Sequence, residues 1–200
     1  MHFLKVIPQD QASAEVRAIF EQSAQKHGYV PNMDMLFSLA PQVRERWQAI
    51  LASVRDPMDL RRYELVTLAA AQALRSSYCM LAHGEVLASK FYSPQQVAAI
   101  AADFRNAGLD ARDVAIMEFA QKVVRDATGT TQADIDGLRG HGLTDVEIFH
   151  VTAAAALRCF FSKMLDALGA QPDSQYARLG TELVAKLTVG RPVAQVPEAR

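Results

Sequence analysis

Apolar residues recur along most of this chain at the three- and four-residue spacing of amphipathic helices. Alternating valine, isoleucine and threonine runs bounded by turns, which would indicate strands, are missing. Residues 12–27 predict a first helix, ended through Gly28 and Pro31. Pro41 suits the first turn of a second helix. We expect its buried stripe to consist of Trp47, Ile50, Leu51 and Val54. The pattern predicts an all-α fold.

Polar start signals place several later helices. Ser93 in "SPQQ" and Thr144 in "LTDVE" each precede a residue that can close a capping box. The second signal opens the longest apolar stretch, which Gly169 ends. Further helices are expected in "LDARDVAIMEFAQKVVRD", at about 131–139 and at about 173–187. We therefore predict one helical domain over residues 1–188, with a rhythm of segments that permits two related halves. The proline-rich residues 189–200 predict a tail or an arm that contacts another subunit.

Length and composition fit a protein with one well-buried core. The chain has 200 residues, half of them apolar, and needs no metal or disulfide for stability. Its net charge is −1 with dispersed basic residues, which argues against nucleic-acid binding. Lys5 and Pro8 interrupt the N-terminal apolar run, and no stretch approaches the ~20 apolar residues of a membrane helix. We therefore expect a cytoplasmic protein that does not bind membranes.

One segment, "RRYELVTLAAAQALRSSYCMLAHGEV" at residues 61–86, carries the candidate chemistry. In one straight helix Glu64 and Cys79 would lie about 22 Å apart, too far to act together. A break at "RSS", with Ser76 as the N-cap of a new helix, would fold Glu64 back over that helix. Cys79 would then be its third residue, where peptide N–H groups and the helix dipole favour a thiolate.

His83 lies one turn after Cys79 on the same helix face. It could take the thiol proton, and Glu64 could orient the imidazole. The structural alternative is a buried cysteine packed beside a satisfied histidine, because cysteine is among the most buried residue types. Gly84, a glycine inside a predicted helix, indicates close packing or access at this point.

The same residues resemble the carboxymuconolactone decarboxylase superfamily, in particular its alkylhydroperoxidase D-like, peroxidase-related branch. The family pattern is a glutamate, then Cys-x-x-Cys-x-x-x-His, and Glu64, Cys79 and His83 match it. Ser76 stands in place of the first cysteine. Sequence similarity in "GYVPN", "YCMLAHG" and "LTDVEIFHVTAAAALRCFFSKMLDALG" extends the resemblance over about residues 5–175. Where branch members often carry asparagine and arginine, this chain has Ser162 and Lys163.

The resemblance implies an all-helical fold, a homo-oligomer (dimer, trimer or hexamer) and hydroperoxide reduction. It makes Cys79 the peroxidatic cysteine, His83 its base and Glu64 part of a proton relay. The resolving role is vacant because Ser76 cannot form a disulfide. Cys159 could supply the missing thiol only within disulfide distance of Cys79. Its apolar setting, "AALRCFF", instead indicates a buried, inert thiol.

Three hypotheses remain open from the sequence. The first is a thiol peroxidase whose one catalytic cysteine reduces a small hydroperoxide and is recycled by an external thiol. The second is a decarboxylase-like enzyme that uses Glu64 and His83 for proton transfer on a lactone or keto acid. The third is a catalytically inactive helical oligomer. None of them calls for a cofactor or a metal; Glu147 and His150, one helical turn apart, lack a third ligand.

Overall fold

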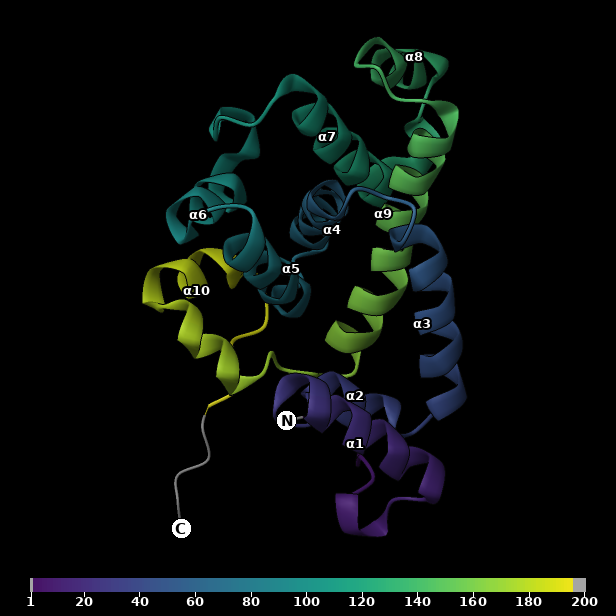
Figure 1. The fold of residues 1–200 in the computed structure, drawn as a ribbon, viewed down its shortest axis with the longest axis vertical. Helices are drawn as coiled ribbons and strands as arrows, with labels where there is room; N and C mark the ends of the chain where they lie inside the picture. Colours follow the sequence, from purple (N-terminus) through teal and green to yellow (C-terminus); the bar gives the residue numbers. More distant parts are fainter. Residues whose placement is uncertain (1, 196–200) are drawn as a thin grey trace.

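A computed structural model describes residues 2–195, and over this range the chain forms helices without strands (Figure 1). The α-helices are α1 (Ala14–His27), α2 (Asn32–Phe37), α3 (Pro41–Arg55), α4 (Leu60–Leu74), α5 (Ser77–Lys90), α6 (Pro94–Asp103), α7 (Ala111–Asp126), α8 (Gln132–Gly140), α9 (Asp145–Ala167) and α10 (Thr181–Leu187). Short 3-10 helices cover Gln9–Gln11, Phe104–Asn106, Ala127–Gly129 and Ser174–Leu179. The predicted all-α class is confirmed.

Helix α4 is the centre of the molecule. Figure 1 shows it surrounded by α5, α7 and α9, the helices against which it packs. Every residue from Tyr63 to Ala71 is buried, so the helix has no solvent-facing side along this stretch. Small alanines at positions 69–71 let neighbouring helices approach closely. Glu64 therefore lies within the core, where a carboxylate requires partners.

The start signals form as predicted. Ser93 and Gln96 make a complete capping box on α6, and Thr144 and Glu147 make one on α9. Within the described residues, α9 alone has the length and hydropathy of a membrane span. It instead packs against α3, α4 and α7, as the core helix of a globular protein does. The cytoplasmic location stays a prediction.

Two elements differ from the sequence prediction because tertiary contacts determine them. Helix α2 was not predicted; its first N–H groups are held by remote side chains, Asn32 N donating to Asp173 Oδ1 (2.7 Å) and Met33 N to the Tyr78 hydroxyl (3.2 Å). The expected helix at 173–187 is divided at Gly180, whose φ of 86° cannot continue a helix. Ile50, expected in the core, is half exposed.

The predicted break between α4 and α5 is confirmed. Arg75 adopts a left-handed conformation (φ 57°), and α5 begins at Ser77, so the two helices form a hairpin. The C-terminal segment fastens this turn, because the Gly190 N–H donates to Ser77 Oγ (2.8 Å). A Cβ on Gly190 would lie 2.1 Å from the Arg75 carbonyl oxygen. Only glycine fits there.

The described part of the predicted tail, residues 189–195, lies against its own chain. Besides Gly190, Ala194 N donates to the Pro172 carbonyl (2.8 Å). Residues 196–200 lie outside the described residues. Helix α10 packs on α5 at Gly84, where an added Cβ would come within 2.6 Å of Leu187. The glycine inside α5 therefore has a packing role.

Candidate functional site

Cys79 is the third residue of α5 and is 1% exposed. Its Sγ accepts a hydrogen bond from Ser162 Oγ (3.1 Å) and lies 3.7 Å from Arg158 Nη1, a second donor. Both donors come from α9, which crosses beside the α4–α5 hairpin. A sulfur that faces two donors is in an environment suited to a negatively charged thiolate.

His83 bridges a carboxylate and a guanidinium. Its Nδ1 lies 2.6 Å from Glu64 Oε2, and its Nε2 lies 3.1 Å from Arg158 Nη1. A guanidinium can only donate, so Nε2 accepts and Nδ1 carries the proton that is donated to Glu64. The edge of the Tyr63 ring packs near the imidazole, with ring centroids 6.2 Å apart.

The structure thus brings Glu64, Cys79 and His83 together, with one change from the expected connections. Among the described residues His83 makes no hydrogen bond to Cys79; its Nε2 faces Arg158, and Arg158 in turn faces the sulfur. The expected contact between base and thiol is therefore replaced by a chain from Glu64 through His83 and Arg158 to Cys79. A resting thiolate would need no adjacent base.

Ser76 occupies the N-cap position of α5, as predicted, but its hydroxyl accepts no hydrogen bond from the first turn. The expectation of a side-chain cap is wrong. The residue is fully buried, and its carbonyl accepts the first intrahelical hydrogen bond of α5, from Met80 N (3.0 Å). Ser76 also does not line the cavity that reaches Cys79.

Arg158 is the residue that the sequence analysis missed. It is 3% exposed, and across residues 2–195 no carboxylate oxygen lies within ion-pair distance of its guanidinium. The rings of Trp47 and Phe161 face its charge at 5.6 and 5.2 Å. A buried, permanently charged group needs a compensating negative charge. The Cys79 sulfur is the group placed to supply it.

A sequence signal for Arg158 and Ser162 does exist. They lie four residues apart in a largely apolar helix, which puts both on one face. Cys159, the next residue along, is turned about 100° away around the helix axis. It is half-buried rather than buried as expected, and both cysteines are free thiols. A resolving role for Cys159 has no support from its placement.

A cavity of about 280 Å³ leads to Cys79. Cys79, Glu64, His83 and Arg158 line it at the buried end; the wall residues are Tyr29, Pro31, Met33, Tyr78, Ala82, Val86, Phe161, Asp173 and Tyr176, and the outer ones Lys26, His27, Glu85 and Arg178. Burial raises the pKa of Tyr29 to about 12 and raises that of Asp173 above its usual range. Aromatic rings dominate the walls, so the cavity suits a small organic molecule.

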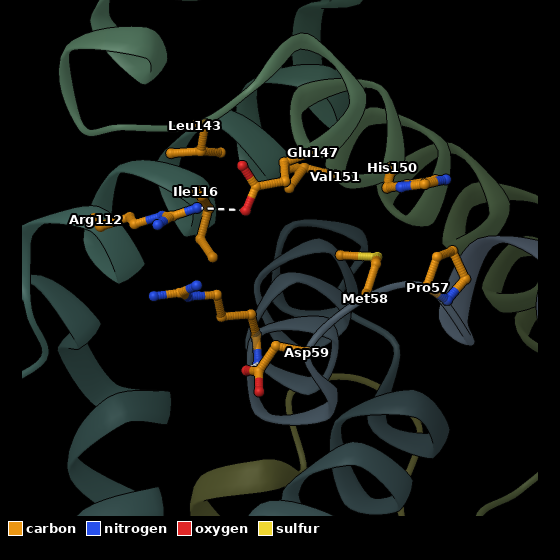
Figure 2. Close-up of a pocket in the computed structure, with 10 residues that line it drawn as sticks. Pro57, Met58, Asp59, Arg112, Ile116, Leu143, Glu147, His150 and Val151 are labelled. Carbon is orange, nitrogen blue, oxygen red and sulfur yellow. Dashed lines mark hydrogen bonds and ion pairs between the residues drawn. The ribbon is translucent and has the colours of Figure 1, made fainter.

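A second, smaller pocket of about 70 Å³ lies away from this site (Figure 2). Its floor is apolar, formed by Met58, Ile116, Leu143 and Val151. Arg112 and Glu147 are joined across one side by an ion pair of 2.5 Å. No cysteine lines this pocket. The candidate chemistry therefore belongs to the larger cavity.

Comparisons with known proteins agree with this geometry. Residues 41–122 match the carboxymuconolactone decarboxylase family. Glu64, Cys79 and His83 all lie within the matched region. A comparison with curated proteins finds no match. The predicted resemblance to this family is thus confirmed over residues 41–122.

Two solved structures share the fold over most of the chain. An uncharacterised peroxidase-related protein with an alkylhydroperoxidase AhpD core, from Ralstonia eutropha JMP134, has a TM-score of 0.80 at 22% identity and covers 88% of this chain and 94% of its own. A peroxidase-related protein from Silicibacter sp. TM1040 has a TM-score of 0.79 at 23% identity, covering 88% and 93%. The debrominase Bmp8 is also similar, with a TM-score of 0.72 at 12% identity, covering 91% and 96%.

Proposed function

For this chain, which matches the carboxymuconolactone decarboxylase family over residues 41–122 and has an alkylhydroperoxidase D-like fold, we propose the activity of a thiol peroxidase with one catalytic cysteine. The Cys79 thiolate attacks the terminal oxygen of a hydroperoxide. The O–O bond breaks, Cys79 becomes a sulfenic acid, and the leaving alkoxide takes up one proton. The observation that carries the proposal is the buried Arg158 guanidinium, which lies 3.7 Å from Cys79 Sγ and has no carboxylate partner among residues 2–195.

The other residues of the site support this step. Ser162 and Arg158 hold the sulfur from one side and leave it facing the cavity. Glu64 orients His83 through the 2.6 Å contact, and His83 orients Arg158. Because Glu64 and His83 also line the cavity, a proton taken up from solvent by this pair can pass to the alkoxide.

Turnover by point variants tests the proposal. Consumption of an organic hydroperoxide in the presence of excess thiol is expected to disappear in Cys79→Ser and to persist in Cys159→Ser, the matched control for the other free cysteine. A Cys79→Ser variant as active as the parent would overturn the proposal. Treatment with iodoacetamide distinguishes the peroxidase from the acid–base alternative. A decarboxylase-like reaction would continue after alkylation of Cys79 and would still require His83.

A second candidate, reductive removal of bromine from a small aromatic compound, has one supporting observation. A debrominase with this fold has been seen bound to 2,3,4-tribromopyrrole, with a TM-score of 0.70 to this chain. The cavity here is lined by Tyr29, Tyr78, Tyr176 and Phe161, whose rings suit an aromatic ligand. Thiol-dependent bromide release from tribromopyrrole, tested beside hydroperoxide consumption, decides between the two substrates.

The predicted homo-oligomer is supported by the surface of α9. This helix carries an apolar stripe at alternating three- and four-residue spacing, in which Val146, Phe149, Ala156 and Phe160 are exposed and Ala153 is half-buried. In an antiparallel pair of α9 helices, the phenylalanines of each copy would flank the central alanines of the other. We propose a second copy of the chain as the occupant. Phe149→Glu is expected to lower the mass measured by light scattering; an unchanged mass would exclude this surface.

A further inference from the structure

We infer that Cys79, once oxidised, is reduced by small thiols that enter the cavity and not by a protein dithiol. This inference rests on the proposed peroxidase. It follows from three features of the site: the depth at which the sulfur lies, the size of the cavity that reaches it, and the lack of a second thiol inside that cavity.

The sulfur is covered by the protein on most sides. Cys79 is 1% exposed, with Ser162 and Arg158 against its sulfur. Lys26 and Arg178, at the outer end of the cavity, are exposed, whereas Cys79 and Arg158, at its inner end, are buried. A reductant must therefore pass through the cavity before its sulfur can attack in line with the S–O or S–S bond.

The cavity admits a small molecule but not part of a folded protein. Its volume of about 280 Å³ is slightly below the range of ligand sites, roughly 300 to 1,000 Å³. The reactive cysteine of a disulfide reductase sits on a folded surface, so its backbone and neighbours would have to enter with it. The rings of Tyr29, Tyr176 and Phe161 line the cavity and occupy the space that such a segment would need.

No resolving thiol inside the protein takes over this task. The cavity is lined by no cysteine other than Cys79; neither Ser76 nor Cys159 contributes to it. A disulfide partner that relays electrons to the surface is therefore missing among the described residues. The external thiol has to react with Cys79 itself.

The chemistry then proceeds in two balanced steps. A thiol RSH attacks the sulfenic sulfur, the S–O bond breaks, and water leaves as the mixed disulfide Cys79–S–S–R forms. A second RSH attacks the R sulfur, the S–S bond breaks, and Cys79 thiolate and RSSR are released. Each hydroperoxide reduced consumes two thiols and yields one alcohol, one water and one disulfide.

The experiment compares reductants in the Cys159→Ser background. In one arm Cys79 is oxidised with one equivalent of hydroperoxide; in the other it is converted to its methyl disulfide with methyl methanethiosulfonate. Recovery of the free thiol is followed by mass spectrometry with 2-mercaptoethanol, glutathione or reduced thioredoxin at equal thiol concentration. We expect 2-mercaptoethanol to act at least tenfold faster than thioredoxin in both arms. Thioredoxin that is as fast or faster would overturn the inference.

Narrowing the cavity tests the route. Val86→Phe places a ring in the cavity wall, and Ser89→Phe places the same ring on the exposed side of α5 as a control. Val86→Phe is expected to slow glutathione at least fivefold more than 2-mercaptoethanol, and equal slowing would contradict entry through the cavity. The methyl disulfide arm does not use peroxide. A site that forms no sulfenic acid yet shows this thiol selectivity would refute the peroxidase and leave the access argument standing.

Discussion

Replacing Arg158 by methionine removes the one cation that lies against the Cys79 sulfur while keeping an unbranched, apolar side chain of similar length. At the observed 3.7 Å, and at an effective dielectric constant of about 20, the attraction between a guanidinium and a thiolate is about 4 kcal/mol. Desolvation of both groups offsets part of this. If a third of the attraction remains, about 1.4 kcal/mol, the ionisation equilibrium of the Cys79 thiol changes tenfold.

The expected result is a fall of at least tenfold in the rate at which iodoacetamide alkylates Cys79 at pH 7, because the thiolate is the reactive form. Lys163→Met is the matched control, since it removes a positive charge from an exposed position of the same helix. Arg158→Lys should retain part of the rate and shows whether the variant site still folds. A folded Arg158→Met protein that is alkylated as fast as the parent would refute the reasoning.

Three further outcomes are expected. Ser76→Cys restores a pair one helical turn apart, so peroxide should convert it to a disulfide with Cys79, seen as the loss of two hydrogens; persistence of both thiols would contradict the placement of residue 76. Glu147 caps α9 and has its pKa lowered below 4.5, chiefly by its backbone hydrogen bond, so it stabilises the fold above pH 4.5 and this contribution is lost as the pH falls through the lowered value. Glu147→Gln should therefore lower the free energy of unfolding, measured by urea denaturation, by about 0.5 kcal/mol at pH 7 and by less at pH 3.5. An equal loss at both pH values would contradict a stabilising role of the Glu147 charge. Gly190→Ala should destabilise the protein by about 1–3 kcal/mol because of the clash with the Arg75 carbonyl, whereas Gly137→Ala, with open space around it, should be neutral or stabilising; similar effects of both would exclude the clash.

The local sequence predicts the parts of the fold that depend on local signals. The capping boxes at Ser93 and Thr144 are determined by residues within one turn of each other, and both form. The break before Ser77 also forms, but it is held by the remote Gly190 N–H and not by a Ser76 side-chain cap. Helix α2 is different. Its first turn is held by Asp173 and Tyr78, which are remote in sequence, so no local pattern could indicate it.

The site divides in the same way. The spacing of Glu64, Cys79 and His83 within a helical hairpin could be found from the sequence, because α4 and α5 are consecutive. Arg158 lies on α9, and its approach to the sulfur depends on how α9 crosses the hairpin. What the sequence offered was a polar pair in an apolar helix. Its partner could be identified only in three dimensions.

The central claim is that Cys79 is a peroxidatic cysteine. The most direct measurement is mass spectrometry of both cysteines after one equivalent of an organic hydroperoxide, quenched with dimedone and repeated with excess 2-mercaptoethanol. The account predicts a dimedone adduct on Cys79, little on the half-buried Cys159, and return of Cys79 to the free thiol when 2-mercaptoethanol is present. Equal labelling of the two cysteines, or an unmodified Cys79, would contradict it.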